Sequence, residues 1–274
     1  LEIIHHPITK DYKYDIKFSK EIIQKISKWR WFSFLNMQKK VAPKLMAIST
    51  PSLSSKNDIA RDFNVSCKKI SVIPNGIDFE VFSPKSNITR ITGQLITTAS
   101  ADVPLKGLDF TLKAIAELIK DYPYLRLIII GAPRIGGHTE RLIKKLKIEA
   151  NIVYKTNLTK EEIAIEYANS NIAIVSSLYE GFGFPVGEAM ACSIPLIATN
   201  VASIPEITGN FAELVPACDS KSIEDSIRNI LSNPFEYQSR ANEGRKHIID
   251  NFDWKKIAQS YENLIYKTID KFEC

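Results

Sequence analysis

The chain has 274 residues, of which 45% are hydrophobic and 24% charged, and its formal net charge is +5 at pH 7. This length predicts one large or two average domains of about 100–200 residues. The 11 Gly and 13 Pro exclude collagen-like and linker-like repeats. The longest mostly apolar stretch, over 125–130 with Arg126 inside it, is far shorter than the roughly 18 residues that span a bilayer. The four Cys form no Cys-x-x-Cys pair, so they predict neither a disulfide framework nor a zinc site, and a reducing cytoplasm fits best.

The positive charge is concentrated near the start of the chain. Residues 10–44 hold ten Lys or Arg against three acidic residues, a local balance of +7 that leaves −2 for the remainder. This distribution indicates a local anionic partner and argues against a nucleic-acid binder. Because aromatic side chains interleave the basic ones, we expect the segment to meet an anionic membrane surface or a lipid-linked acceptor. The alternative is a scaffold helix with aromatic side chains in a core and solvated lysines. The aromatic residues are Trp29, Trp31, Phe32 and Phe34.

The first 85 residues contain only part of an α/β domain. Apolar runs predict strands over 1–4, 44–49 and 70–73. Amphipathic patterns predict helices over about 18–28, 30–42 and 54–63, the last capped by Ser54 or Ser55. These elements are too few for a domain of about 100–150 residues. Because the chain also begins inside a strand and without Met, we expect a fragment of a longer protein. The polar stretch 84–93 is the expected domain boundary.

From about residue 91, short apolar runs alternate with amphipathic stretches. The runs predict strands over 94–98, 125–130, 151–154, 172–176, 195–199 and 211–215. The stretches between them predict helices over 108–119, 138–149, 159–168 and 185–192. This alternation predicts right-handed βαβ units and a doubly wound parallel sheet. Three further helices are predicted over 220–232, 235–250 and 254–270.

One strand-to-helix loop holds the residues that carry chemistry. It reads Glu180-Gly-Phe-Gly-Phe-Pro-Val-Gly-Glu188 and follows the carboxyl end of a predicted parallel strand, where α/β sheets bind ligands. Its three glycines let a ligand approach the backbone, and the positive end of the next helix, with Pro185 in its first turn, favours a phosphate. Carboxylates at both ends accept hydrogen bonds from paired hydroxyls, as in ribose or a hexose. Together these features predict a sugar-nucleotide site.

Other interpretations of this loop remain open. Gly-rich turns are common in α/β proteins, and Glu188 could be an ordinary acid of the first helical turn. The glycines run G-x-G-x-x-x-G, close to a dinucleotide fingerprint, which calls for an acid at the end of the next strand. That strand ends at Thr199-Asn200, which weakens a nicotinamide interpretation.

Five segments in chain order carry a family resemblance: 73–84 (beginning Ile-Pro-Asn-Gly-Ile-Asp), 104–107 (Pro-Leu-Lys-Gly), 180–188, 204–206 (Ile-Pro-Glu) and 252–254 (Phe-Asp-Trp). They resemble, from about residue 44 to the end, motifs of the family 4 retaining glycosyltransferases, also called glycosyl transferases group 1. The resemblance implies an α/β fold of GT-B type. Its parts would be the remainder of an N-terminal, acceptor-side Rossmann-like domain at 1–85, a complete C-terminal Rossmann-like doubly wound domain at 86–253, and a helix at 254–274 that returns toward the N-terminal domain.

The resemblance also implies roles for individual residues. Glu188 would hold the ribose hydroxyls of a nucleoside-diphosphate sugar, such as a UDP- or GDP-sugar, and Glu180 the hydroxyls of its sugar. Lys106 would neutralise the departing diphosphate, and His5 would lie near the reacting sugar, although it could equally be a turn residue. No cofactor is implied beyond this donor. The phosphate cradle would be completed by the backbone of Gly183, Phe184, Pro185, Val186 and Gly187.

Two departures and one absence qualify this resemblance. Ser100 stands six residues before Lys106, where the family usually has an Arg, and Ala202-Ser203 replaces a usual pair of glycines. Arg134 is a candidate substitute cation. No Asp-x-Asp pair occurs, so we expect no metal ligands, and the leaving group would depend on Lys106 and the helix end. Base contacts are expected from the loop that contains Thr156 and Asn157.

These observations predict a retaining, metal-independent glycosyltransferase of the hexosyltransferase type. It would move a sugar to the hydroxyl of a glycan or lipid-linked acceptor, in the cytoplasm and in contact with the inner face of the membrane. The alternatives are a nucleotide-sugar epimerase of GT-B fold and a non-catalytic donor-binding subunit, the latter motivated by Ser100 and by the incomplete N-terminal domain.

Overall fold

The computed structural model describes residues 1–18, 22–99 and 102–273. Its contacts divide the chain into two compact units, both of α/β class with parallel sheets. Unit 1 comprises Leu1–Gly76, Tyr179–Phe182 and Phe252–Cys274. Unit 2 comprises Ile77–Leu178 and Gly183–Asn251. Two long segments of the chain therefore contribute to each unit. The short segment 179–182, which lies in the sequence between the two parts of unit 2, belongs to unit 1.

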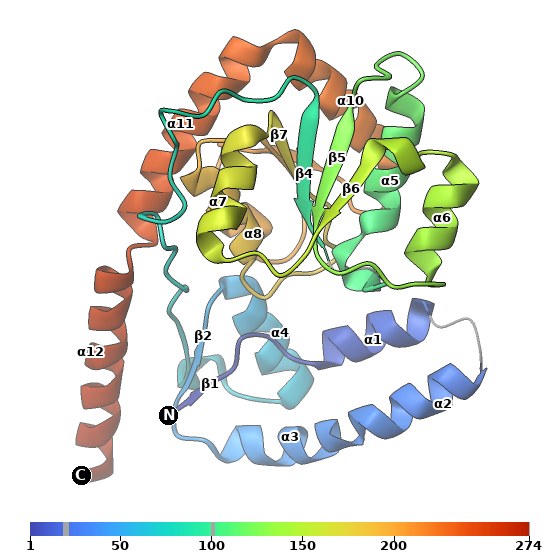
Figure 1. Ribbon diagram of the computed structural model, residues 1–274. Helices are drawn as coiled ribbons and strands as arrows, with labels where there is room; N and C mark the ends of the chain where they lie inside the picture. The colour runs from blue at the N-terminus through green and yellow to red at the C-terminus, as the bar shows by residue number, and fades with distance from the viewer. Residues whose placement is uncertain (19–21, 100–101, 274) are drawn as a thin grey trace. The chain divides into compact units, whose positions relative to one another are not determined.

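Unit 2 is built on a six-stranded parallel sheet of order β6-β5-β4-β7-β8-β9 (Figure 1). Its strands are β4 (Gln94–Thr98), β5 (Arg126–Ile130), β6 (Ile152–Lys155), β7 (Ile172–Val175), β8 (Leu196–Thr199) and β9 (Glu213–Val215). The register of the central pairs runs from Gln94 opposite Arg126 and from Leu95 opposite Ile172. Chain order reverses between β4 and β7, which is the point where doubly wound sheets bind their ligands.

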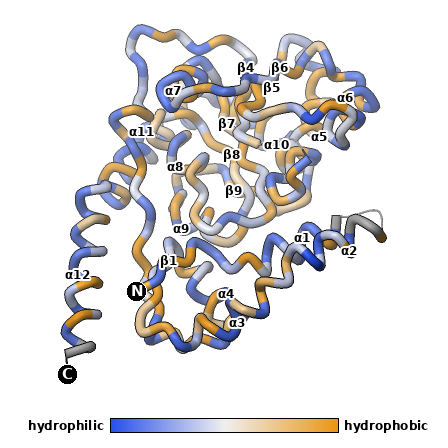
Figure 2. The backbone as a smooth tube through the Cα atoms, turned by 60° about the horizontal axis from the view of Figure 1, so that its bottom comes forward, coloured by the Kyte–Doolittle hydropathy of each residue, from blue (hydrophilic) through white to orange (hydrophobic). Residues whose placement is uncertain are grey.

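Helices cover both faces of this sheet, which explains why its central strands β4, β5, β7 and β8 are largely buried. In Figure 1, α5, α6 and α10 lie on one side of it and α7, α8 and α11 on the other. Figure 2 shows the strands as a mostly apolar band through the middle of the unit. The bounds are α5 (Leu108–Leu118), α6 (His138–Leu146), α7 (Lys160–Asn169), α8 (Phe184–Ala191), α9 (Ile204–Thr208), α10 (Ser220–Ser232) and α11 (Pro234–Asn251).

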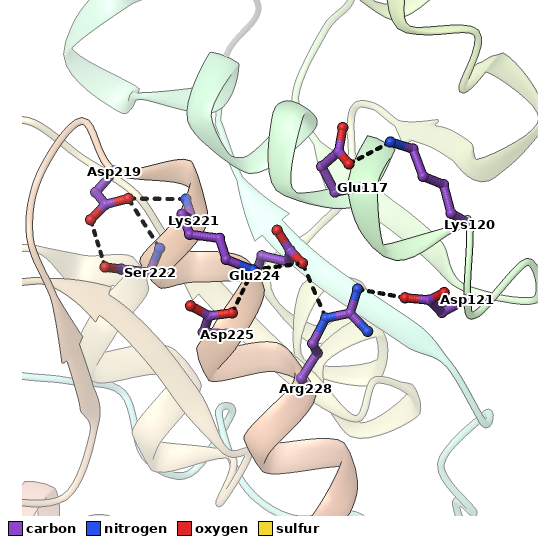
Figure 3. A network of polar contacts seen from close by, with 9 residues as sticks. All are labelled: Glu117, Lys120, Asp121, Asp219, Lys221, Ser222, Glu224, Asp225 and Arg228. Carbon is purple, nitrogen blue, oxygen red and sulfur yellow. Dashed lines mark hydrogen bonds and ion pairs between the residues drawn. The ribbon is translucent and has the colours of Figure 1, made fainter.

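A polar network on the surface joins α10 to the turn after α5 (Figure 3). Arg228 contacts Asp121 at 2.7 Å and Glu224 at 3.1 Å, and the Asp219 carboxylate caps α10 by accepting from two backbone N–H groups at 3.0 Å each. Water screens exposed ion pairs of this kind. The packing of the two helices therefore depends on the buried apolar side chains beneath, among them Leu112, Ile115, Ile223 and Ile227.

Unit 1 contains a three-stranded parallel sheet of order β1-β2-β3. Its strands are β1 (Glu2–Ile3), β2 (Ile48–Thr50) and β3 (Ile70–Val72), and its helices are α1 (Thr9–Phe18), α2 (Ile22–Trp31), α3 (Leu35–Val41), α4 (Leu53–Phe63) and α12 (Trp254–Glu273). A small core joins the sheet to α4 through Ile48, Ile59, Phe63, Val65 and Ile70. No helix of the described ranges is long and apolar enough to span a bilayer.

Most differences from the predicted elements lie in unit 1. The predicted helices at 18–28 and 30–42 are replaced by α1, α2 and α3, and part of the first prediction, 19–21, lies outside the described residues. Helix α1 has few aliphatic positions and packs instead through an aromatic side chain, Tyr12, whose ring lies 5.3 Å from that of Phe32. The cap of α4 is Ser52, two residues earlier than predicted, because its extended backbone lets its side chain accept from the N–H of Ser55.

Candidate functional site

The loops after β4 and β7 meet at the switch point of the unit 2 sheet. Pro104–Lys106 form a 3₁₀ turn just before α5. The N–H of Leu178 donates to the carbonyl of Leu105 at 2.7 Å, and the hydroxyl of Ser176 donates to the carbonyl of Lys106 at 3.1 Å. The structure therefore brings the predicted phosphate-contacting loop beside the segment that leads into the Glu180–Glu188 motif.

Gly107 makes this close approach possible. Its φ is +61°, and a Cβ atom built on it would lie 2.0 Å from the backbone oxygen of Ser176. A residue with a side chain would meet both backbone strain and a clash with main-chain atoms. Gly107 therefore fixes the position of Lys106 relative to the end of β7.

Helix α8 begins at the centre of the motif. Gly183 precedes it with φ +104°, and Pro185 stands in its first turn, as predicted. The N–H groups of Val186 and Gly187 donate to the carbonyl of Gly183 at 3.0 and 3.3 Å, and proline has no N–H. These amides are thus used inside the first turn, unlike the open cradle that the sequence suggested. What α8 offers an anion is chiefly the positive end of its dipole, beside the exposed Phe184.

Glu188 is a carboxylate of unit 2 whose pKa is raised by burial. It lies in α8 with part of its surface exposed, yet among the described residues none donates a hydrogen bond to it. Burial raises the pKa of Glu188 to about 7, and the nearby Lys160 offsets this only in part. A carboxylate that is enclosed and lacks donors marks a candidate binding site, because a ligand can supply the missing hydroxyls.

Tyr167 supports this part of the site and was not among the predicted residues. It is fully buried in α7, and its hydroxyl contacts Thr98 at 3.2 Å and the carbonyl of Pro185 at 3.4 Å. Burial raises its pKa well above the usual range, so it stays neutral and can donate. Nothing in the spacing of the α7 sequence distinguishes Tyr167 from an ordinary core residue.

Glu180 lies in the part of the motif that belongs to unit 1. Both of its neighbours are tied there, since the hydroxyl of Tyr179 donates to Asp58 at 3.0 Å and the carbonyl of Gly181 accepts from Ser52 at 2.8 Å. The backbone of His5 also lies here, because a Cβ atom on Gly181 would be 2.8 Å from its oxygen. His5, near the start of the chain, therefore lies in unit 1 beside the residue that follows Glu180.

The remaining predicted residues lie elsewhere in unit 2. Thr156 and Asn157 follow the edge strand β6, which is two strands from β4, and Asn157 has a positive φ of 57°. Arg134 is exposed, and its Nε lies 3.9 Å from Asp102, a carboxylate that also accepts the backbone N–H groups at the start of α6. Ser100 lies outside the described residues.

Two other segments of the resemblance meet in unit 1. A Cβ atom on Gly76 would lie 2.3 Å from the ring of Trp254, so the indole packs directly on the glycine.

Of the residues described, no group of three or more His, Cys, Asp or Glu side chains is arranged to hold a metal ion. Metal independence remains a prediction.

Comparison with known proteins identifies relatives along the whole chain. Residues 82–247 match the family described as glycosyl transferases group 1. The MMP alpha-(1->4)-mannosyltransferase of Mycolicibacterium hassiacum is 34% identical over 270 residues, which cover 97% of this chain and 64% of that protein. The D-inositol 3-phosphate glycosyltransferase of Streptomyces bingchenggensis is 26% identical over 222 residues, covering 74% of this chain and 48% of the relative. The chain thus spans about half to two thirds of these relatives.

Solved structures share the fold. The sucrose-phosphate synthase of Thermosynechococcus elongatus aligns with a TM-score of 0.81 at 20% identity, covering 98% of this chain and 67% of its own. Anabaena Alr3699/HepE, solved in complex with UDP and glucose, aligns with a TM-score of 0.77 at 17% identity, covering 97% and 70%. These likenesses confirm the predicted α/β fold of GT-B type.

Proposed function

This chain belongs to the glycosyl transferases group 1 family, and on that basis we propose that it is a metal-independent, retaining hexosyltransferase that uses a nucleoside-diphosphate sugar. The acceptor is a hydroxyl of a glycan or of a lipid-linked sugar. Mannose is the first donor sugar to test, because the relative with 34% identity is named a mannosyltransferase. UDP- and GDP-sugars both belong in the test, since a structural neighbour was solved with UDP.

The carboxyl group of Glu188 is the observation that carries this proposal. It is enclosed in α8 with a pKa of about 7, and it lacks a donor among the described residues. A ribose diol supplies two hydroxyl donors to one carboxylate, and these hydrogen bonds would offset part of the unfavourable free energy of enclosing the charge. The same helix begins just after Gly183, and its positive end would favour a diphosphate bonded to that ribose.

The proposed reaction needs stabilisation of a departing diphosphate more than it needs a nucleophile. As the bond from sugar to phosphate breaks, negative charge grows on the leaving oxygen, and Lys106 with the first turn of α8 would stabilise that charge. Glu180 would orient the sugar through its hydroxyls. Retention follows if the acceptor attacks from the face that the diphosphate leaves, with a phosphate oxygen taking the acceptor's proton.

Incubation with labelled UDP- and GDP-hexoses tests this function against its alternatives. A transferase releases nucleoside diphosphate together with a glycoside or free sugar, whereas an epimerase of GT-B fold gives the epimeric sugar. A donor-binding subunit binds the donor and leaves it unchanged. Transfer that continues in excess EDTA and gives a product of the donor's anomeric configuration supports the proposal. An inverted product, or complete loss of transfer in EDTA, contradicts the finer mechanism.

Replacing Lys106 by alanine should lower turnover at least tenfold and nucleotide affinity much less. The reason is that diphosphate charge increases between the bound donor and the transition state. An interaction with a charged group is worth about 1.5–3 kcal/mol, or roughly tenfold or more. Initial rates and titration calorimetry separate the two effects, with Lys120→Ala as the matched control at an exposed lysine. An equal loss of affinity for nucleoside and nucleoside diphosphate would contradict a phosphate contact.

We also propose that α2 is the part of the basic segment that contacts an anionic membrane, at the cytoplasmic face. Ile22, Ile26 and Trp29 lie on one side of this helix and are 76%, 60% and 66% exposed. Lys25 and Arg30 flank that apolar face at helical spacing. The scaffold interpretation fits Phe32 and Leu35, which are buried, whereas Trp31 is exposed like Trp29.

Sedimentation with liposomes tests this contact. Binding is expected with anionic and not with neutral vesicles, and it should fall with salt, because each basic residue near an anionic surface contributes about 1 kcal/mol. The double variant Lys25→Glu/Arg30→Glu should abolish it. Lys28 is left intact because it pairs with Asp15 at 3.6 Å. The control Lys68→Glu/Lys120→Glu changes the charge equally at exposed lysines elsewhere, and an equal effect of both double variants would contradict a role for α2.

A further inference from the structure

We propose that Tyr179, Ser52 and Ser55 are positioning residues that fix the backbone on both sides of Glu180. This inference rests on the proposed function, in which Glu180 contacts the donor sugar. The segment Tyr179–Phe182, here called the strap, belongs to unit 1, whereas the residues before and after it belong to unit 2. The strap is therefore a short piece of the motif with its own set of contacts, and these contacts decide where the carboxylate of Glu180 can be.

The residue before Glu180 is held by an ionic cluster centred on the buried Asp58. The Tyr179 hydroxyl donates to Asp58 Oδ2 at 3.0 Å, while Asp58 Oδ1 accepts from Lys10 at 2.9 Å and from Arg61 at 2.6 Å. The Lys10 ammonium also lies 5.3 Å from the centre of the tyrosine ring. Burial, then the Asp58 charge, raises the pKa of Tyr179 well above the usual range, so it remains a donor. The cluster holds the ring at two points, its hydroxyl and its face.

The residue after Glu180 is held by the first turn of α4. The carbonyl of Gly181 accepts from the hydroxyls of Ser52 at 2.8 Å and Ser55 at 3.1 Å, and both serines are buried. These residues stand at the positive end of α4, which favours a carbonyl oxygen there. A Cβ atom on Gly181 would lie 2.9 Å from Cβ of His6, so only glycine lets the strap come this close.

The end of the strap is anchored as well. The ring of Phe182 packs edge-on against that of Phe252 at 5.9 Å, and both residues are buried. The next residue, Gly183, has φ +104° and begins the segment that belongs to unit 2. Glu180 is thus held by unit 1 from Tyr179 to Phe182, while Glu188 is carried by α8 of unit 2. The two glutamates of one motif are positioned by different sets of contacts.

Because Glu180 and Glu188 are held by different contacts, variants of the strap contacts should affect the two glutamates differently. Loosening the strap should affect what Glu180 does, which is to hold the sugar, and should leave the nucleotide contact of Glu188 intact. A merely structural role would lower stability and weaken all ligands together. The distinguishing quantity is the ratio of affinities for a sugar nucleotide and for its nucleoside diphosphate.

The test uses Tyr179→Phe and Ser55→Ala, with Tyr261→Phe as the matched control. Tyr179→Phe removes one hydroxyl and leaves Asp58 its two cations. Ser55→Ala removes one donor to Gly181 and keeps Ser52 as the cap of α4. Tyr261→Phe removes a comparable hydroxyl of the same unit, which accepts from Ser49 at 3.3 Å. Calorimetry with the nucleoside diphosphate and the sugar nucleotide, initial rates, and hydrogen exchange of the peptide covering 179–183 are the readouts.

For both strap variants we expect a fall in turnover and in the preference for the sugar nucleotide of about three- to tenfold, the range of one neutral or charge-assisted hydrogen bond. Nucleoside diphosphate affinity should stay within about twofold of the wild type. Exchange at 179–183 should be faster in both variants and unchanged in Tyr261→Phe. Parallel losses for both ligands, or variants that match the control in rate and exchange, would overturn the inference. Wild-type protein that binds no nucleoside diphosphate would instead refute the proposed function, and the exchange readout would still report whether the strap is held.

Discussion

Replacing Glu188 by alanine is expected to weaken nucleoside diphosphate binding at least tenfold, with a smaller effect on the turnover of bound donor. Each charge-assisted hydrogen bond from a ribose hydroxyl to the carboxylate is worth about 1.5–3 kcal/mol. Titration calorimetry of the wild type and the variant measures the difference directly. Glu180→Ala is the companion variant, in which turnover should fall more than nucleotide affinity. Affinities and rates within twofold of the wild type for both variants would place the site elsewhere.

The raised pKa of Glu188 adds a pH dependence with a definite sign. The folded protein holds this proton up to a pH of about 7, whereas the ordinary value is 4.5, so the folded state binds more protons between these values. Stability from this group is therefore fully present below about pH 4.5 and is lost as the pH rises through about 7. At 1.36 kcal/mol per unit, the loss is at most about 3 kcal/mol.

The variant Glu188→Gln isolates this effect, because the amide has nearly the same shape and does not ionise. In urea unfolding without ligand, the variant should match the wild type near pH 5 and exceed it by up to about 3 kcal/mol near pH 8. Nucleotide binding should release protons at pH 7, since the diol favours the ionised carboxylate. A stability difference that is the same at both pH values would contradict the assignment of the pKa.

Replacing Gly107 by alanine should destabilise unit 2 strongly and displace the loop that carries Lys106. The added Cβ would lie 2.0 Å from the oxygen of Ser176, and φ at this position is +61°. The unfavourable φ costs about 1–2 kcal/mol, and the clash with main-chain atoms adds to it, so we expect a total of about 3 kcal/mol or more. Thermal and urea unfolding measure the loss, and turnover should fall with it because the lysine moves.

The chain offers a matched control for this variant. Gly136 has φ +67°, and a Cβ atom there would have no neighbour within 4 Å. Gly136→Ala therefore introduces backbone strain without a clash. It should lower the free energy of unfolding by about 1–2 kcal/mol and leave turnover unchanged. The difference between the two variants measures the clash with Ser176. Equal losses would mean that the β4–α5 loop is free to move away from the end of β7.

The doubly wound sheet could be predicted from the sequence because its signals are local. Strand β4 has the predicted bounds of 94–98, and α10 those of 220–232, since a short β-branched and apolar stretch and a clean helical period are both visible in the chain. Helix α1 was missed because it packs through Tyr12, an aromatic contact that aliphatic periodicity does not reveal. The predicted phosphate cradle from the backbone of 183–187 also differs in part, because the first turn of α8 uses the N–H groups of Val186 and Gly187 itself.

The contacts that position the candidate site are harder to predict from the sequence, because they join residues far apart in the chain. Ser52 and Gly181 are separated by 129 positions, and nothing near either one indicates the other. The expected cap of α4 was Ser54 or Ser55 and not Ser52, and Tyr179 is one aromatic residue before a glycine-rich loop. The sequence therefore supplied candidate ligand-binding residues, which stay predictions, and left open which residues hold them in place.

The central claim, that this chain binds a nucleoside-diphosphate sugar, is tested most directly by thermal unfolding with added UDP, GDP and ADP, each beside its nucleoside. A ligand at 100 times its dissociation constant stabilises the folded protein by about 2.7 kcal/mol. We expect one diphosphate to raise the melting temperature in the wild type, its nucleoside to raise it less, and Glu188→Ala to lose most of the shift. No shift with any diphosphate at millimolar concentration, or a shift of equal size in Glu188→Ala, would contradict the account.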